Sequence, residues 1–197
     1  MGRIACIVEG HGDVASVPVM VRRIATEIDC QTVEVLRPIR VKRTQVVRPG
    51  ELERAVELGA GKLGHVGGIL VLLDADQDPP CQLGPSLLER IRSRQANLLA
   101  TVVLAQSEKE AWFIASIESL RGKRGIPPTA CAPENPEEIR GAKEWLGRLR
   151  GYPYRETIDQ PAFAASFDMT LAALRSASFA RFRREVEALL RGISENS

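Results

Sequence analysis

The sequence predicts an α/β fold with a mostly parallel, four-stranded sheet, flanking helices and a mainly helical C-terminal extension. Short apolar runs rich in β-branched residues alternate with segments of helical apolar spacing, and this alternation is typical of a parallel sheet covered by helices. A chain of 197 residues, 44% hydrophobic and 26% charged, can bury a core without disulfides or metal staples. We expect one domain over residues 1–197, with the α/β core at 1–119 and the helical extension at 120–197.

The first strand and helix are predicted near the N-terminus. Residues 4–8 form an apolar, β-branched run that is typical of a strand buried on both faces. A loop with Gly10 and Gly12 follows. Residues 18–28 then have helical spacing, with Pro18 in the first turn, where its missing N–H costs nothing. Strand, glycine turn and helix make the first half of a βαβ unit.

The rest of the chain continues this alternation. Further strands are predicted at residues 32–36, 69–73 and 98–105. Further helices are predicted at residues 51–63, 83–96, 138–150, 170–174 and 178–192. Ser107 is a candidate N-cap with Glu110 as its capping-box partner, which predicts another helix start there. Prolines predict a loop at 121–137. The aromatic residues expected in the core are Trp112, Phe113, Phe179 and Phe182.

Acidic side chains follow three of the predicted strands. They are, in chain order, Glu9, Asp13, Asp74, Asp76, Asp78, Glu108 and Glu110. Parallel strands end at one edge of the sheet, so these side chains are expected to gather there, with Asp74 and Asp76 pointing the same way. Gathered carboxylates repel unless a cation is present, and Mg²⁺ takes oxygen ligands and bridges to phosphates. The pattern predicts a Mg²⁺ site open to a phosphate-containing substrate, although Asp-x-Asp also occurs in turns and caps with a purely structural role.

Positive charge is local rather than global. Lys and Arg total 27 against 25 Asp and Glu, so the net charge is only +2, and any nucleic-acid contact must come from a patch. Residues 37–48 carry five basic side chains and no acid. Such a run can grip a phosphate backbone or protect a sheet edge from aggregation. The candidate nucleic-acid contacts are Arg40, Lys42, Arg43 and Lys109.

Cysteine spacing and hydropathy exclude other classes of protein. The cysteines at positions 6, 30, 81 and 131 are too far apart in sequence for a zinc-ligand pair. The N-terminal apolar stretch is too short for a signal peptide, and no run approaches the ~18 apolar residues of a membrane span. We expect a soluble protein that resides in the reducing cytoplasm and does not associate with a membrane.

Two segments resemble the motif pair of the Toprim domain, a glutamate after the first strand and an Asp-x-Asp after a later one. They are residues 8–13 (Val-Glu-Gly-His-Gly-Asp) and 71–78 (Val-Leu-Leu-Asp-Ala-Asp-Gln-Asp). Toprim domains occur in topoisomerases, primases and the nucleases of the overcoming-lysogenization-defect (OLD) family. The sequence is most similar to a family of small stand-alone bacterial Toprim-like proteins of uncharacterised function. The shared features include Glu110 before an aromatic pair, the segment 154–160 and a helical segment at 178–182.

The resemblance implies a Toprim/Rossmann-like fold and Mg²⁺-dependent phosphodiester hydrolysis, with Mn²⁺ as the substitute ion. Glu9 would be the general acid/base or a ligand of a second ion. Asp74 and Asp76 would hold Mg²⁺, and Asp13 would complete a second metal site. Glu110 would match the later glutamate of the family.

Three further residues complete the implied site. Asp78 would bind the metal through water, and Glu108 is the second choice for the later glutamate. Lys109 would contact a phosphate, or it is a solvated lysine at a helix start. Tyr152 and Tyr154 lie in a loop of the C-terminal part that nothing in the sequence places at the site. Attack by water is therefore favoured over a covalent tyrosyl intermediate.

The resemblance also leaves a second reading open, from a different class of function. The chain would then be a non-catalytic or partner-dependent Toprim-like subunit that works with an ATPase of the AAA or ABC type in a defence or DNA-processing complex. DNA is expected rather than RNA, and a homodimer is left open. A receiver-like phospho-acceptor domain ranks low, because no fifth strand with a following lysine is found after Ala105.

Overall fold

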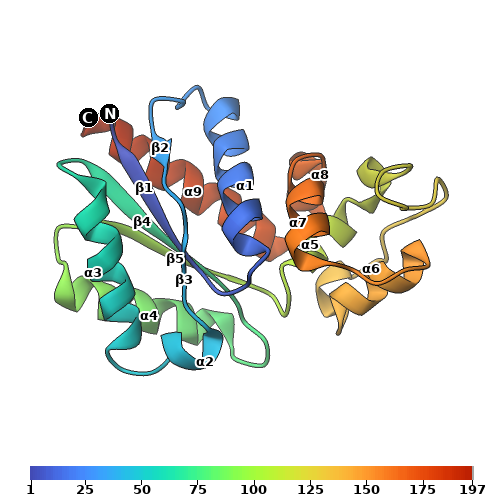
Figure 1. The fold of residues 1–197 in the computed structure, drawn as a ribbon, viewed down its shortest axis with the longest axis horizontal. Helices are drawn as coiled ribbons and strands as arrows, with labels where there is room; N and C mark the ends of the chain where they lie inside the picture. The colour runs from blue at the N-terminus through green and yellow to red at the C-terminus, as the bar shows by residue number, and fades with distance from the viewer. Residues whose placement is uncertain (197) are drawn as a thin grey trace.

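Parallel strands form the centre of the structure, which is a computed structural model that describes residues 1–196 (Figure 1). Within that range the sheet has five strands: β1 (Arg3–Val8), β2 (Glu34–Val35), β3 (Ile39–Arg40), β4 (Gly67–Asp74) and β5 (Leu99–Ala105). The strand order is β2-β1-β4-β5, β3 also pairs with β1, and every pair is parallel. The predicted α/β class is confirmed.

The edge of the sheet beside β1 differs from the prediction. A single strand was expected at 32–36, but β2 has two residues and a further strand, β3, follows it along the same edge. Arg3 is in register with Glu34 in β2, and Ile7 is in register with Ile39 in β3. Pro38 lies between the two strands and has no N–H to donate, so the ladder is interrupted there.

Nine α-helices surround the sheet in the described part of the chain. They are α1 (Asp13–Glu27), α2 (Arg43–Val46), α3 (Glu51–Leu63), α4 (Pro80–Arg94), α5 (Glu110–Ala115), α6 (Ala142–Arg150), α7 (Glu156–Ala164), α8 (Met169–Arg175) and α9 (Ala177–Glu195). Two 3₁₀ turns, η1 (Ile117–Leu120) and η2 (Pro136–Glu138), complete the set. The helix predicted at 51–63 has these bounds, and those at 170–174 and 178–192 lie within α8 and α9.

The sheet is buried on both faces because alternate residues of each strand point to opposite sides. In β1, Ile4 and Cys6 pack with α1 and α9, whereas Ala5 and Ile7 pack with α3 and α4. Figure 1 shows these two helix pairs on opposite sides of the sheet. All four residues are at most 2% exposed, so the prediction of a strand buried on both faces is confirmed.

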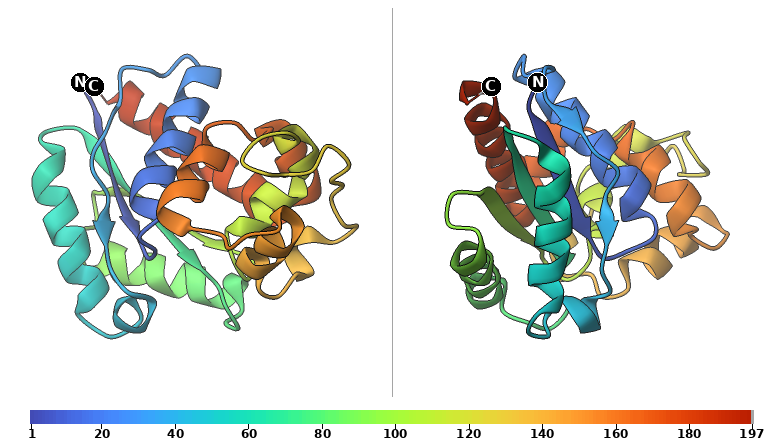
Figure 2. Two further views of the ribbon diagram at one scale, coloured as in Figure 1. Left: turned by 45° about the vertical axis from the view of Figure 1, so that its right-hand side comes forward. Right: turned by 60° about the vertical axis from the view of Figure 1, so that its left-hand side comes forward.

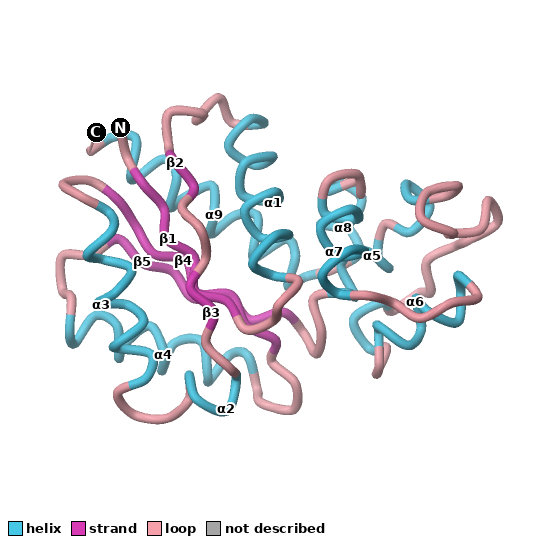
Figure 3. The backbone as a smooth tube through the Cα atoms, viewed as in Figure 1, coloured by secondary structure: helices cyan, strands magenta, loops and turns pink. Residues whose placement is uncertain are grey.

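The helices α5 to α8 form a group at one side of the sheet, where the strands end (Figure 3). An aromatic cluster holds this group to α9, with the Trp112 ring 5.2 Å from that of Phe179 and 5.0 Å from that of Phe182. Phe113 packs edge-on against Phe167. The prediction that Trp112, Phe113, Phe179 and Phe182 are core residues is confirmed.

Several predicted helix starts are wrong. Helix α1 begins at Asp13, because the N–H groups of Ala15 and Ser16 already bond to the Gly12 carbonyl, so Pro18 lies inside the helix. Ser107 has a φ of 59° and caps nothing, and α5 begins at Glu110. Helix α6 begins at 142 rather than 138, after a left-handed glycine. Helix α7 was not predicted, because Pro161 masks its pattern.

Candidate active site

A polar cavity of about 240 Å³ lies at the carboxyl ends of β1 and β4. Four of the acids predicted to follow the strands line it, Glu9, Asp13, Asp74 and Glu110, together with Glu156 of α7. Glu9 directly follows β1, Asp74 ends β4, Asp13 opens α1 and Glu110 opens α5. The fold thus brings together the four predicted acids, which are up to 101 residues apart. We call this cavity the carboxylate pocket.

Lys109 lies between two of these acids. Its Nζ is 2.7 Å from Oδ1 of Asp74 and 3.3 Å from Oδ2 of Asp13, and its side chain is 4% exposed. Its backbone N–H also donates to Asp74 over 2.9 Å, which fixes the start of α5 against the end of β4. Burial opposes the charged form, but Asp13 and Asp74 together raise the pKa of Lys109 above its ordinary value. The ammonium therefore stays charged and supplies an internal counter-ion.

Two carboxylates of the pocket have an oxygen without a partner. Oε2 of Glu9 and Oε2 of Glu110 are buried and accept no hydrogen bond. Burial, together with the charge of Asp74, raises the pKa of Glu110 to about 8. Burial likewise raises the pKa of Glu9, which Lys109 only partly opposes. A proton or a cation bound to these oxygens would relieve the cost of burying them.

Asp13 is held in place by two further contacts. Its Oδ2 accepts the backbone N–H of Gly10 over 2.8 Å, and its Oδ1 accepts Nε2 of Gln160 over 2.6 Å. Gln160 belongs to α7, which lies beside α1 in both views of Figure 2. With Lys109 as a third partner, Asp13 has little capacity left for an ion.

Asp76 and Asp78 lie outside the carboxylate pocket. Asp76 has a φ of 53°, so the chain turns after β4 and the expected extended Asp-x-Asp geometry does not form. Both side chains line a separate cavity and pair with Arg43, the Asp76 contact being 3.9 Å. Glu108 lines that second cavity too, and its Oε1 accepts the N–H of Ala142 at the start of α6.

The predicted basic contacts surround the pocket. Arg40 and Lys42 are exposed and line it, and Arg43 lines it with its guanidinium committed to Asp76 and Asp78. Lys109, by contrast, is at its centre rather than on its rim. An approaching phosphate would therefore meet Arg40 and Lys42 first.

The sequence did not point to three polar residues that line the pocket. Lys143, Glu156 and Gln160 come from α6 and α7, and Nζ of Lys143 is 2.5 Å from Oε1 of Glu156. The segment 154–160 resembles the family pattern, which is the one signal that pointed to α7. Nothing in the local sequence marks Lys143.

Tyr154 lies closer to the acids than the sequence indicated. Its hydroxyl is buried without a hydrogen-bond partner. Burial, followed by the charge of Glu110, raises the pKa of Tyr154 well above its ordinary value. A phenol that resists ionisation is a poor nucleophile, which agrees with the expectation of attack by water.

The donor chemistry of the pocket suits a hard divalent cation. The unpartnered oxygens of Glu9 and Glu110 are of the kind that Mg²⁺ takes as ligands, and Asp74 lies in the same pocket. As the side chains stand in residues 1–196, however, no three His, Cys, Asp or Glu residues are close enough together to hold an ion. Metal binding would therefore require these side chains to move, and Asp74 to share or leave Lys109.

The fold and this pocket define an α/β protein with a parallel sheet and a carboxylate–lysine site at its carboxyl edge. Residues 8–187 match the family described as "Domain of unknown function (DUF4276)". The chain belongs to this family. The comparison with curated proteins finds no match.

Two solved structures match this chain over nearly its whole length. The C-terminal region of the Burkholderia pseudomallei OLD protein is 18% identical, with 97% of this chain and 98% of that chain covered and a TM-score of 0.48. The C-terminal region of the Xanthomonas campestris pv. campestris OLD protein is 16% identical, with 95% of each chain covered and a TM-score of 0.42. Identity this low carries nothing about activity.

Proposed function

We propose that this protein hydrolyses phosphodiester bonds of nucleic acid, DNA rather than RNA, with Mg²⁺ or Mn²⁺ in the carboxylate pocket. The observation that carries the proposal is the convergence of Glu9, Asp74 and Glu110 at one edge of the sheet, beside the exposed cations Arg40 and Lys42. Carboxylates for a metal next to cations for a phosphate backbone are the parts that this reaction needs.

Each residue of the pocket has a task in this reaction. Glu9, Asp74 and Glu110 would hold the cation, which stabilises charge on the phosphoryl oxygens and lowers the pKa of a bound water. Glu9 has a raised pKa and can also accept the proton of the attacking water or return one to the leaving oxygen. Lys109 keeps Asp13 and Asp74 in place, and Arg40 and Lys42 orient the strand.

Plasmid nicking tests the proposal. The wild-type protein should nick supercoiled DNA with Mg²⁺ or Mn²⁺ and stop when chelator is added. Glu9→Gln and Asp74→Asn should each lower the rate by about a hundredfold or more, the range for loss of an acid–base group. Asp78→Asn is the matched control, because Asp78 lies outside the pocket and its loss should leave the rate close to wild type.

Two results would contradict this function. Nicking that survives both Glu9→Gln and Asp74→Asn would show that the activity comes from another site or a contaminant. No nicking by the wild-type protein, under conditions where its melting transition is intact, would exclude the reaction for the chain alone.

A second candidate is favoured by the position of Lys109. Because its ammonium already offsets part of the negative charge of Asp13 and Asp74, the isolated chain has a reduced need for a metal, and a partner would have to open the pocket. In this case the chain is a subunit of an assembly with an AAA- or ABC-type ATPase, as a monomer or homodimer. Nicking would then appear only when a partner ATPase is added, and would still be lost in Glu9→Gln.

A further inference from the structure

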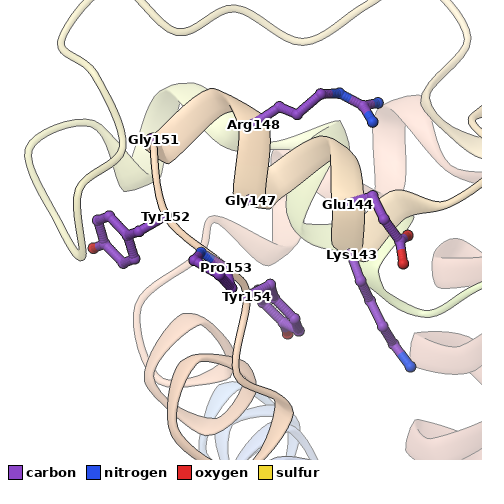
Figure 4. Close-up of a pocket in the computed structure, with 8 residues that line it drawn as sticks. All are labelled: Lys143, Glu144, Gly147, Arg148, Gly151, Tyr152, Pro153 and Tyr154. Atoms are coloured by element: carbon purple, nitrogen blue, oxygen red, sulfur yellow. The ribbon is translucent and has the colours of Figure 1, made fainter.

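We propose that the cavity between α6 and residues 151–154 binds a nucleobase of the substrate strand, next to the phosphate that the proposed function places in the carboxylate pocket. This inference rests on that function and adds the part of the substrate that is recognised. The cavity has a volume of about 600 Å³, within the range of small-molecule sites. Figure 4 shows it along α6, bordered by the segment that carries Tyr152, Pro153 and Tyr154.

Two glycines shape the border of this cavity. Gly147 in α6 has no side chain where the chain returns past the helix, and a Cβ there would be 3.4 Å from the Tyr152 carbonyl oxygen. Gly151 adopts a left-handed φ of 78° that lets the chain reverse at the end of α6, and a Cβ there would meet nothing within 4 Å. The result is a groove between α6 and the returning chain, with Tyr152 at its border.

Tyr152 borders the groove, and its ring is fixed before any ligand arrives. The residue is 41% exposed. Its hydroxyl donates to the Arg124 carbonyl over 2.7 Å, and the Arg150 guanidinium lies 4.2 Å from the ring centroid. Gly125 allows the close approach, since a Cβ there would be 2.5 Å from the hydroxyl. A ring held by three contacts loses little freedom when a base stacks on it.

Lys143 joins the two sites. It lines both this cavity and the carboxylate pocket. In Figure 4 its side chain leaves α6 in the same direction as the ring of Tyr154, away from Arg148. A strand with a phosphate beside Lys143, in the first turn of α6, would run along the groove toward Tyr152, which follows the end of the helix. Arg148 lines the same groove and adds positive charge for the strand.

Two observations favour a nucleobase over an apolar peptide as the ligand: the cavity shares Lys143 with the carboxylate pocket, and its lining is positively charged. Two cations and one acid, Glu144, line the groove, so its charge suits a polyanion. Base stacking on an aromatic ring is tolerant of sequence, so the cavity would favour single-stranded or unpaired nucleotides over one particular base.

The inference is tested by measuring the binding of two fluorescently labelled four-nucleotide chains (tetramers) in the absence of divalent cation. One is oligothymidylate, and the other is the same sugar–phosphate chain without bases. Tyr152→Leu should bind oligothymidylate about tenfold more weakly, the effect of losing one stacked base, and bind the abasic chain as the wild type does. Tyr152→Phe keeps the ring and should keep the affinity. Lys143→Met should weaken both ligands.

If Tyr152→Leu does not fold, Gly147→Ala is the alternative variant, because its Cβ would narrow the groove in ordinary contact with the Tyr152 carbonyl oxygen, 3.4 Å away, without removing a hydrogen bond. The inference is overturned if both variants bind oligothymidylate like the wild type, or if they weaken both tetramers equally. Plasmid nicking is measured in parallel. If the variants bind oligothymidylate like the wild type and the wild type still nicks plasmid, the base site is refuted but the proposed function is not. Absence of binding to either tetramer by a wild-type protein that also fails to nick removes the proposed function as well.

Discussion

At the scale of single residues, Lys109 decides the electrostatics of the carboxylate pocket. Its ammonium contacts Asp74 and Asp13 in a place where an ion would otherwise be needed to offset their repulsion. The same contact also limits how an ion can bind, because Asp74 is already committed. Metal affinity and protein stability are therefore linked through this one side chain.

Lys109→Met should destabilise the protein in the absence of metal. Removing one partner of a buried ion pair leaves charges unpaired, which costs about 3–5 kcal/mol. Mg²⁺ should then raise the melting temperature of the variant more than that of the wild type, because the freed carboxylates bind it more tightly. Thermal unfolding with Mg²⁺ and with chelator measures both effects. Lys42→Met is the control on the exposed rim, and an equal Mg²⁺ shift in all three proteins would refute the link.

Glu110 should make stability depend on pH. Its pKa is raised by burial to about 8 in the folded protein, against 4.5 as the ordinary value. Between these values the folded state binds the proton and the unfolded state does not, so stability falls as pH rises from about 4.5 to about 8. Urea unfolding of metal-free protein should show a shallower fall in Glu110→Gln than in the wild type. Glu108→Gln, outside the pocket, should follow the wild type, and identical slopes for all three would exclude this assignment.

At the scale of elements, α7 completes the site, and a buried acid holds it in place. Asp159 is fully buried, and its carboxylate accepts hydrogen bonds from Arg150 and Arg124. Burial opposes the charge, but these arginines lower the pKa of Asp159 to about 2. These two ion pairs tie α7 to α6 and to the loop that carries Arg124. They thereby position Gln160 against Asp13.

Asp159→Asn should lower the free energy of unfolding by about 3–5 kcal/mol at neutral pH, because Arg150 then remains buried without its counter-charge. The wild-type advantage should be complete above about pH 4 and should disappear as pH falls toward 2, since the native carboxylate is then protonated. Chemical denaturation from pH 2 to 7 tests the trend. A loss below about 0.5 kcal/mol, as expected for the exposed control Glu144→Gln, would show that the pair is not needed.

Gly12→Ala should separate α7 from α1. A Cβ at Gly12 would be 2.0 Å from Oε1 of Gln160 and 2.7 Å from the Glu156 carbonyl oxygen, and backbone cannot move aside cheaply. Such overpacking costs about 1–3 kcal/mol. Gly61→Ala is the matched control, because a Cβ there meets nothing within 4 Å in helix α3, and alanine should stabilise the helix by about 0.5–1 kcal/mol. Equal unfolding free energies for the two variants would contradict the packing argument.

At the scale of the whole molecule, exposed cations lie beside the carboxylate pocket although the net charge is only +2. Arg40 and Lys42 are exposed at that edge, whereas Arg92 and Arg94 lie at the far end of α4. In the described part of the chain, no helix is both long and apolar enough to cross a bilayer.

Nucleic-acid binding should depend on salt through this edge. Each phosphate contact with duplex DNA contributes about −0.9 to the slope of log affinity against log salt concentration. The double variant Arg40→Gln/Lys42→Gln should therefore reduce the slope by about two units. Arg92→Gln/Arg94→Gln makes the same change in net charge at the far end and should leave the slope unchanged. Equal slopes for both double variants would place the binding surface elsewhere.

Periodicity explains how much of the architecture could be predicted. Three strands could be predicted because each is an apolar run with no helical pattern beside it, at residues 4–8, 69–73 and 98–105. Their type and position therefore depend only on the residues within each run. Boundaries were less predictable, because Gly12 and a turn at Ser107, rather than a proline or a cap, determine where α1 and α5 start.

The sequence by itself determined that strands would alternate with helices and that Glu9, Asp74 and Glu110 would follow strand ends, since these features depend only on residues near one another in the chain. Only the tertiary structure decided that Lys109 would occupy the centre of the acids, that Asp76 would turn toward Arg43, and that α7 would close the pocket. The physical reason is distance along the chain: the contact of Lys109 with Asp74 spans 35 residues and that of Gln160 with Asp13 spans 147. Such contacts exist only once the layers have packed.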